Sequence, residues 1–415
     1  MNESKSRLRH DIVALGLVQM ANYAIPLITI PYLTRVLGVH AFGQVAFAQA
    51  LRAYFIVIIE FGFTLSATRE IASRRNDRAH VSRTFINTWF AQLGLLFFTA
   101  LLAFIMVNAV SRLRVDGALY ASAFIGVFGT TLFPIWLLQG LERLRDGAFI
   151  QVGSRLLGVI PLFLMVHGPQ DAVLVLVIQG LSILLGGVFS LLWIKQQELV
   201  DWMMPNWYEI TSAYKEGYQI FSSRVSISLY TAAVPIVLGW VSGPSAMGYF
   251  TLADKLRSAA QAMTSPVTQA LYPRMSYLFK NEPGEAKKLL KRSAVLVVVI
   301  AGLMSLGLFI FSDLIIYYVA GKGYGPAAQV LRWLAFVPFA VALSNLLGVQ
   351  IMLPLHMNKR FNMILVSASG ICLLVVWFLV SKNHEIGAAQ TILLVESYVV
   401  FMMFLYLKKK YFISH

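Results

Sequence analysis

The sequence is poor in cysteine and in charge. A single cysteine, Cys372, stands among 415 residues, which excludes an intramolecular disulfide and a thiolate metal cluster. Only 13% of the residues are charged and 58% are apolar, whereas a soluble domain is about half apolar and about a quarter charged. A chain of this composition cannot cover its own surface with polar groups, so we expect an integral membrane protein.

The chain also lacks the features of a membrane-bound enzyme. Its apolar segments are joined by short connections, which leave no room for the outer domain expected of a glycosyltransferase or a polysaccharide polymerase. No phosphate-binding loop of the form G-x-x-x-x-G-K-[ST] occurs. The seven histidines are scattered without i,i+4 pairing, so we expect no metal and no cofactor. These absences disfavour an enzyme, and we assign no catalytic residue.

Apolar runs long enough to cross a bilayer are the dominant feature that is present. A transmembrane helix needs about 20 predominantly apolar residues. We therefore predict an all-α integral membrane protein with twelve transmembrane helices, at 12–36, 42–67, 85–109, 116–140, 147–166, 171–194, 217–241, 246–271, 293–312, 326–352, 361–381 and 386–407. The first run is too long for a signal peptide and is expected to be retained.

The formal charge of +15 is explained mainly by topology. Of the 34 Lys and Arg residues, 23 lie on the side that holds both predicted termini, five lie on the opposite side and six lie inside spans. Because basic residues collect in cytoplasmic loops, both termini are expected in the cytoplasm, and nucleic acid is not an expected partner. Trp136, Trp193 and Trp240 lie near predicted span ends, where we expect interfacial anchors.

The two halves of the chain resemble each other at an offset of 205 residues. The pattern G-x4-G-x8-R recurs, so that Gly38, Gly43, Leu51, Arg52 and Arg69 correspond to Gly243, Gly248, Leu256, Arg257 and Arg274. We predict two pseudo-symmetric six-helix bundles around a central cavity: 1–194, then a cytoplasmic linker along the inner membrane surface at 195–216, then 217–415. An even number of helices per repeat is typical of transporters whose halves rock around a substrate.

Six cations and three acids fall inside the predicted spans, a net charge of +3. A charge inside a bilayer is costly, so such residues usually face a cavity or a partner. The cations, which we predict to bind an anionic substrate group as a relay, are Arg52, Arg155, Arg224, Lys255, Arg257 and Arg332. Arginine suits a phosphate because its planar fork pairs with two oxygens at once. For each single cation, a structural salt bridge or a snorkelling side chain is the alternative.

The three acids, Glu60, Asp254 and Glu396, are candidates for an ion-coupling site, and counter-ions to the arginines are the alternative. Asp254 and Arg257 are spaced i,i+3 on one helical face, so they can neutralise each other. Lys255 is about 200° from Arg257 around the helix and cannot face the same way.

Several motifs resemble the family of Wzx-type O-antigen flippases, the polysaccharide transporters of the large flippase and multidrug-exporter superfamily. In the first half these are Asn22-Tyr23, Pro31 to Gly38, Phe42-Gly43, Phe61-Gly62-Phe63, Ala67-Thr68-Arg69 and Phe133 to Glu142. In the second half they are Met247 to Phe250, Asp254-Lys255-Leu256 and Leu271-Tyr272-Pro273-Arg274. The resemblance covers the first ten predicted helices.

The resemblance implies a substrate and a location. The substrate is an oligosaccharide repeat unit on undecaprenyl pyrophosphate, moved from the cytoplasmic to the periplasmic leaflet of a bacterial inner membrane by alternating access. Coupling to a proton or sodium gradient is suggested, and a polysaccharide polymerase and a chain-length regulator are candidate partners. Two alternatives stay open. One is an exporter of another anionic lipid or small molecule in the same superfamily, although the net cationic spans argue against a drug or metabolite exporter. The other is a polymerase or ligase, which the short outer loops disfavour.

Overall fold

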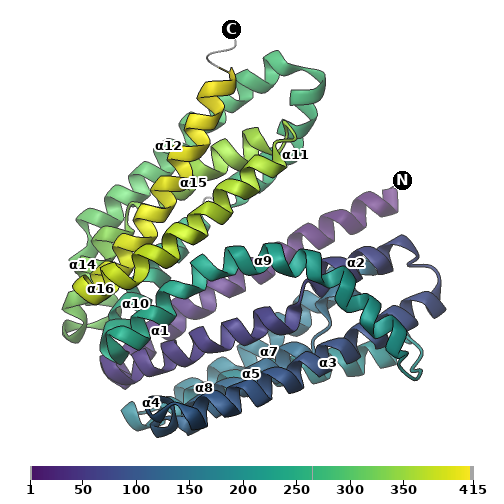
Figure 1. The fold of residues 1–415 in the computed structure, drawn as a ribbon, viewed down its shortest axis with the longest axis horizontal. Helices are drawn as coiled ribbons and strands as arrows, with labels where there is room; N and C mark the ends of the chain where they lie inside the picture. Colours follow the sequence, from purple (N-terminus) through teal and green to yellow (C-terminus); the bar gives the residue numbers. More distant parts are fainter. Residues whose placement is uncertain (1, 264, 412–415) are drawn as a thin grey trace. The chain divides into compact units, whose positions relative to one another are not determined.

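The computed structural model is built from helices throughout the part of the chain that it describes. It describes the backbone of residues 2–263 and 265–411 and the side-chain surroundings of 24–218, 220–221, 233–263, 271–272 and 274–409. In the N-terminal half the elements are α1 (Asn2–Glu60), α2 (Phe63–Ser73), α3 (Arg78–Ala109), α4 (Ser111–Val115), α5 (Gly117–Thr131), α6 (Ile135–Gly140), α7 (Leu144–Met165), η1 (Pro169–Asp171) and α8 (Ala172–Gln196) (Figure 1). They continue as α9 (Trp207–Val241), α10 (Gly243–Ala262), α11 (Ser265–Asn281), α12 (Pro283–Ile310), α13 (Ser312–Ala320), η2 (Lys322–Tyr324), α14 (Gly325–Leu334), α15 (Val337–Leu347), η3 (Gly348–Met352) and α16 (Asn358–Tyr411).

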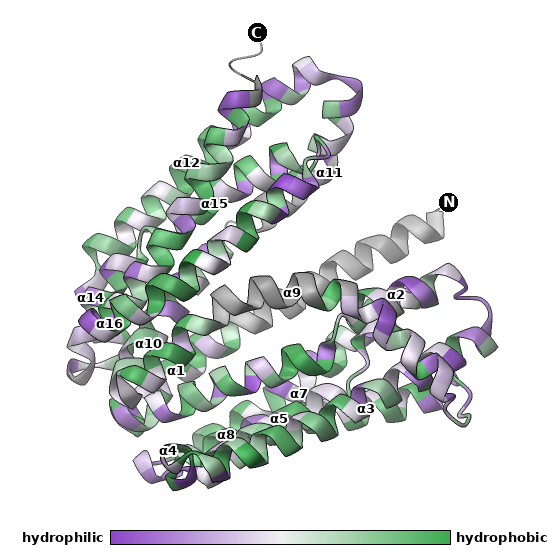
Figure 2. Ribbon diagram, viewed as in Figure 1, coloured by the Kyte–Doolittle hydropathy of each residue, from purple (hydrophilic) through white to green (hydrophobic). Residues whose placement is uncertain are grey.

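Among the described residues, eight helical segments are long and apolar enough to cross a membrane. They are Ala24–Ser73, Arg78–Ala109, Gly117–Gly140, Leu144–Met165, Pro169–Gln196, Pro283–Ile310, Lys322–Met352 and Asn358–Lys409. Hydrophobic residues run along these helices in Figure 2, and hydrophilic residues gather at their ends and in the connections. The protein is therefore an all-helical membrane protein.

Two of these segments are much longer than one bilayer crossing. Ala24–Ser73 has 50 residues and Asn358–Lys409 has 52, and at 1.5 Å per residue each is about 75 Å long, against a hydrocarbon core of about 30 Å. Each contains a residue that breaks the helical conformation, Gly38 with φ 70° and His384 with φ 49°. The length and the break together allow two crossings in each segment.

Two compact units make up the chain. The N-terminal unit comprises residues 1–32 and 44–225, and the C-terminal unit comprises residues 33–43 and 226–415. Both α1 and α9 contribute to the two units, because the unit boundaries fall inside these helices. The predicted division into 1–194, 195–216 and 217–415 stays a prediction.

In the N-terminal unit, α5 packs along α8, and α7 and α3 pack beside this pair (Figure 1). Small residues allow the close approach: a Cβ atom on Gly187 of α8 would lie 2.7 Å from the carbonyl oxygen of Gly129 on α5. Trp136 is 1% exposed and its Nε1 donates a hydrogen bond to Gln92 Oε1. The prediction of Trp136 as an interfacial anchor is wrong. The helix is interrupted at Pro134, and the indole of Trp136 at the start of α6 packs in the core.

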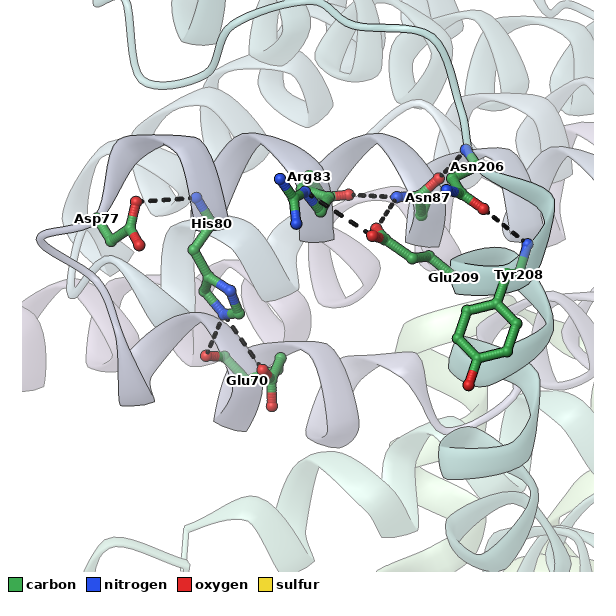
Figure 3. Close-up of polar contacts among 8 residues, drawn as sticks. All are labelled: Glu70, Asp77, His80, Arg83, Asn87, Asn206, Tyr208 and Glu209. Carbon is green, nitrogen blue, oxygen red and sulfur yellow. Dashed lines mark hydrogen bonds and ion pairs between the residues drawn. The ribbon is translucent and has the colours of Figure 1, made fainter.

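The connection between α8 and α9 is tied to the start of α3 by a polar network (Figure 3). The backbone N–H of Asn206 donates to Asn87 Oδ1 at 2.7 Å, and Asn87 Nδ2 donates to Glu209 Oε2 at 2.5 Å. Arg83 lies 3.8 Å from the other oxygen of Glu209. Asn87 is 3% exposed, so its buried amide fixes the start of α9 against α3 within the N-terminal unit.

The turn between α2 and α3 is held in the same region (Figure 3). The side chain of Asp77 caps α3 by accepting from the backbone N–H of His80 at 3.1 Å. The His80 ring, in turn, places Nε2 3.2 Å from a carboxylate oxygen of Glu70 on α2. Further along α9, the hydroxyl of Tyr214 donates to the Ala91 carbonyl at 2.7 Å, and burial raises the pKa of this hydroxyl, which keeps it protonated as a donor.

In the C-terminal unit, α10 packs on α14, and α15 and α14 pack on α16. The glycines of the sequence repeat meet here. A Cβ atom on Gly43 would lie 2.9 Å from the backbone nitrogen of Gly248, and a Cβ atom on Gly248 would lie 3.4 Å from the backbone nitrogen of Gly43. The second glycine of the G-x4-G pattern is therefore a packing requirement, since its two copies face each other with no room for a side chain. The first glycine, Gly38 or Gly243, has a positive φ of 70° or 85°, which favours glycine.

Candidate functional site

Arg52 lies on α1, within the N-terminal unit, and crosses over to the backbone of α5. Its Nη1 is 2.9 Å and its Cδ is 3.1 Å from the position that a Cβ atom would take on Gly126. The same Nη1 is buried and has no hydrogen-bond partner among the described residues. A buried N–H without a partner is costly in a folded protein, and at a membrane depth it marks a place where a ligand or water completes the site.

A second arginine adds to the positive charge at this place. Arg155 of α7 is half-buried, and its charge interacts with that of Arg52. Next to Arg52 a cavity of about 280 Å³ opens between α1, α3 and α5, lined mainly by apolar side chains such as Phe55, Phe104 and Phe124. Two neighbouring cations beside a low-dielectric wall attract an anion strongly, because little solvent screens them.

The repeat-related arginine of the C-terminal unit has different surroundings. Arg257 of α10 places Nε 2.8 Å and Nη2 2.7 Å from Asp254 Oδ1, so the predicted i,i+3 pair is present. Its Nη1 donates to Gln261 Oε1 at 2.5 Å, and Nη2 also donates to Ser258 Oγ at 2.8 Å. All of these partners lie on α10 itself, so Arg257 is folded back along its own helix and neutralised by Asp254.

A third charged residue faces the same place. Glu396 of α16 is half-buried, and its charge interacts with that of Arg257. Asp254, Arg257, Gln261 and Glu396 together line a cavity of about 390 Å³ that also includes Ser344 and Asn345 of α15. This cavity holds two carboxylates and one guanidinium, so it carries a formal charge of −1 where the Arg52 centre carries +2.

The remaining predicted residues are not in these two centres. Lys255 is exposed and does not line the cavity beside Arg257, as the helical spacing predicts. Arg332 of α14 binds Ser312 Oγ at 3.0 Å and forms an ion pair with Asp313, so it cross-links α14 to α13. Glu60 is half-buried at the end of α1, and the side chain of Arg224 lies outside the described residues.

Three further residues belong to the two centres although the sequence did not single them out. Ser258 and Gln261 complete the hydrogen bonding of Arg257, and Gly126 supports Arg52. The i,i+4 spacing of Arg257 and Gln261 was a usable signal. Gly126 carried no such signal, because its role depends on a contact with a residue 74 positions away.

The fold is that of a class of transporters with known structures. A multidrug resistance MATE family transporter of the MOP superfamily, solved in an inward-facing conformation, matches with a TM-score of 0.69 at 17% identity over 96% of this chain and 98% of the other. The lipid II flippase MurJ in an inward closed conformation matches with a TM-score of 0.72 at 12% identity, over 96% of this chain and 87% of the other. At such identities the likeness defines the fold alone.

Sequence comparisons place the chain in a family. The model of the family described as "Polysaccharide biosynthesis protein" matches residues 8–279, and the chain belongs to this family. It is 32% identical to a protein of Escherichia coli (strain K12), provisionally named an O-antigen transporter, over 98% of both chains. A protein of Shigella dysenteriae with the same name is 28% identical over 95% of this chain and 99% of its own. The prediction of a transporter rather than an enzyme is confirmed by these relatives.

Proposed function

We propose that this protein is a flippase for an undecaprenyl-pyrophosphate-linked oligosaccharide, an O-antigen or related repeat unit. The observation that carries the proposal is the Arg52 centre. Arg52 lines an apolar cavity, Arg155 adds a second positive charge beside it, and one buried N–H group of Arg52 has no partner within the described part of the chain. A pyrophosphate offers the oxygen acceptors and the negative charge that such a centre requires. The names of the relatives support the same cargo.

The architecture in this proposal has twelve transmembrane helices in two six-helix bundles around a central cavity. Its support is the repeat at offset 205, the two units of the fold and the two helical segments that are long enough to cross twice. In this proposal both termini lie in the cytoplasm, as the distribution of Lys and Arg indicates. The bacterial inner membrane is proposed from the resemblance to the flippase family. Reporter fusions at both ends of the chain test this orientation, since a periplasmic reporter should stay inactive at each.

The six predicted cations receive unequal support as substrate ligands. Arg52 and Arg155 form the receiving centre, and Arg224 is proposed to deliver the headgroup to it from the cytoplasmic side. Arg257 serves only when it is released from Asp254, while Lys255 and Arg332 have surface or cross-linking positions. Cysteines placed at 52, 155, 224 and 257 in a Cys372→Ser background should react with aqueous thiol reagents. If all four thiols were unreactive, the proposal that these positions face a water-filled cavity would be rejected.

Ion coupling is proposed for the cavity that holds Asp254, Arg257 and Glu396. A carboxylate beside one guanidinium can exchange that partner for a proton or a sodium ion, and the exchange changes the charge of the cavity by one unit. Glu60 is a weaker candidate because it does not line this cavity. Proteoliposome transport with Glu396→Gln tests the assignment: the variant should bind substrate and lose its dependence on the ion gradient.

Deletion and complementation test the function itself. A deletion strain should accumulate repeat units on their carrier in the inner leaflet, and the wild-type gene should restore surface polysaccharide while an Arg52→Ala variant should not. If single translocated units accumulated on the outer face, the chain would be a polymerase and the proposal would fail. If the deletion strain exported the repeat unit normally and accumulated another anionic lipid, that lipid would replace the repeat unit as the proposed cargo. Polymerase and chain-length proteins remain candidate partners that crosslinking in the membrane would identify.

A further inference from the structure

The backbone of α5 forms the floor under the guanidinium of Arg52. At Gly126, an added Cβ atom would meet three atoms of Arg52 first: Nη1 at 2.9 Å, Cδ at 3.1 Å and Cζ at 3.5 Å. Ordinary contact between such atoms begins at about 3.5 Å. An alanine at this position therefore displaces the end of the Arg52 side chain unless α5 itself moves away.

Close packing behind α5 prevents the helix from moving away. On the far side lies α8, where an added Cβ on Gly180 would already lie 3.1 Å from the backbone nitrogen of Gly126. One turn further, the contact between Gly187 and Gly129 brings the same two backbones together. Since α5 and α8 touch through their backbones, the flexible guanidinium is the part that gives way.

The second repeat provides a natural contrast. The residue 205 positions after Gly126 is Leu331 on α14, and it is fully buried. The repeat-related Arg257 does not cross to a neighbouring helix and instead binds Asp254, Ser258 and Gln261 of its own helix. In the second half, the arginine that is turned back and neutralised is thus followed 74 residues later by a buried leucine, where the first half has a glycine.

We infer that Gly126 is a positioning residue for Arg52: the missing side chain lets the guanidinium rest on α5 with a buried N–H group available to an anionic ligand. The inference rests on the proposed function, because it assumes that Arg52 meets the anionic group of the cargo. Gly126 acts through Arg52 and does not contact the cargo. A shift of the guanidinium by roughly half an ångström should weaken binding of a pyrophosphate by about tenfold.

The test measures the affinity of purified protein for geranyl pyrophosphate, a short isoprenyl pyrophosphate, by tryptophan fluorescence. Four proteins are compared: wild type, Gly126→Ala, Arg52→Ala and the double variant. Gly126→Ala should lose about tenfold in affinity and Arg52→Ala more. The double variant should bind as weakly as Arg52→Ala alone, because the added methyl group has no other atom to displace.

The matched control is Gly153→Ala on α7, a mid-helix glycine of the same unit with nothing within 4 Å of the added Cβ. It should keep wild-type affinity and show the same small gain in helix stability as Gly126→Ala. Thermal unfolding of all variants separates positioning from a folding defect: a positioning role leaves the unfolding temperature of Gly126→Ala at or above that of wild type.

The outcomes are distinguishable. Wild-type affinity in Arg52→Ala overturns the assigned role of Arg52 in the proposed function. A strong loss in Arg52→Ala with wild-type affinity in Gly126→Ala overturns the positioning inference and leaves the proposed function intact. A further loss in the double variant relative to Arg52→Ala, or a lowered unfolding temperature for Gly126→Ala, also overturns it, since the glycine would then act through general packing.

Discussion

Arg52 and Arg257 occupy the same position in the two sequence repeats, and the two units treat them in opposite ways. Arg52 crosses to α5, has Arg155 as a charged neighbour and keeps a buried N–H group without a partner among the described residues. Arg257 stays on α10, where Asp254 and two neutral side chains satisfy it. The repeat preserves the cation, and the surroundings decide whether its charge is available. We propose that this difference separates an anion-binding centre from an ion-coupled one.

The largest expected effect is on the stability of the C-terminal unit. Arg257→Leu leaves Asp254 and Glu396 in a cavity without their cation and should destabilise the protein by about 3 kcal/mol. Thermal unfolding in detergent measures it. The double variant Asp254→Asn/Arg257→Leu is the control and should recover part of the loss, since one of the two stranded charges is gone. An unchanged unfolding temperature for Arg257→Leu would show that the pair is solvated and would break the comparison.

In the N-terminal unit, removal of the arginine is expected to raise the stability of the protein. Arg52→Met removes the repulsion with Arg155 and a buried N–H group for which the described side chains and backbone offer no partner. The unbranched side chain of methionine occupies much of the same space. The protein should become more stable by about 1 kcal/mol and should lose transport in the complementation assay. A site that gains stability when its function is lost is typical of binding residues. A clear loss of stability in Arg52→Met would mean that Arg52 has a structural partner.

A substitution in the polar network between α3 and the start of α9 tests whether a loss of stability alone lowers the affinity of the Arg52 centre. Asn87→Ala removes the hydrogen bonds to Asn206 and Glu209 (Figure 3) and should cost about 1–2 kcal/mol. The affinity for geranyl pyrophosphate should stay at its wild-type value, because Asn87 does not line the cavity beside Arg52. A fall in affinity together with stability would couple the linker to the Arg52 centre.

The smallest effects are expected at the surface cations. Lys255→Gln removes an exposed charge and should change stability by less than about 0.5 kcal/mol. Arg332→Gln breaks an ion pair with Asp313. Because the side chain of Arg332 is 41% exposed and that of Asp313 is 68% exposed, the loss of stability should be less than about 1 kcal/mol. Both variants should complement the deletion strain. Loss of transport in either one would extend the anion path beyond the two centres.

Much of the fold could be predicted from the sequence because hydropathy and helix length are local properties. The apolar run at 85–109 lies within α3, and the run at 171–194 covers the last residue of η1 and most of α8. The i,i+3 spacing predicted the pair of Asp254 and Arg257. The prediction for Trp136 was wrong because its position near a span end says nothing about which face of the helix is covered. The break between α5 and α6 places that indole in the core.

The sequence by itself determined a membrane protein with a repeat, and a net positive charge inside its spans, because composition, period and charge can be counted along one dimension. The tertiary structure alone decided which of those charges are neutralised. Arg52 contacts Gly126, 74 positions away, and feels the charge of Arg155, 103 positions away, because α5 and α7 pack beside α8 in the same unit. Arg257 found its partners within one turn of its own helix. The two arginines occupy the same repeat position, yet one is neutralised by a carboxylate and the other lies beside a second cation. The difference arises because helix packing, and not the residue type, decides which side chains become neighbours.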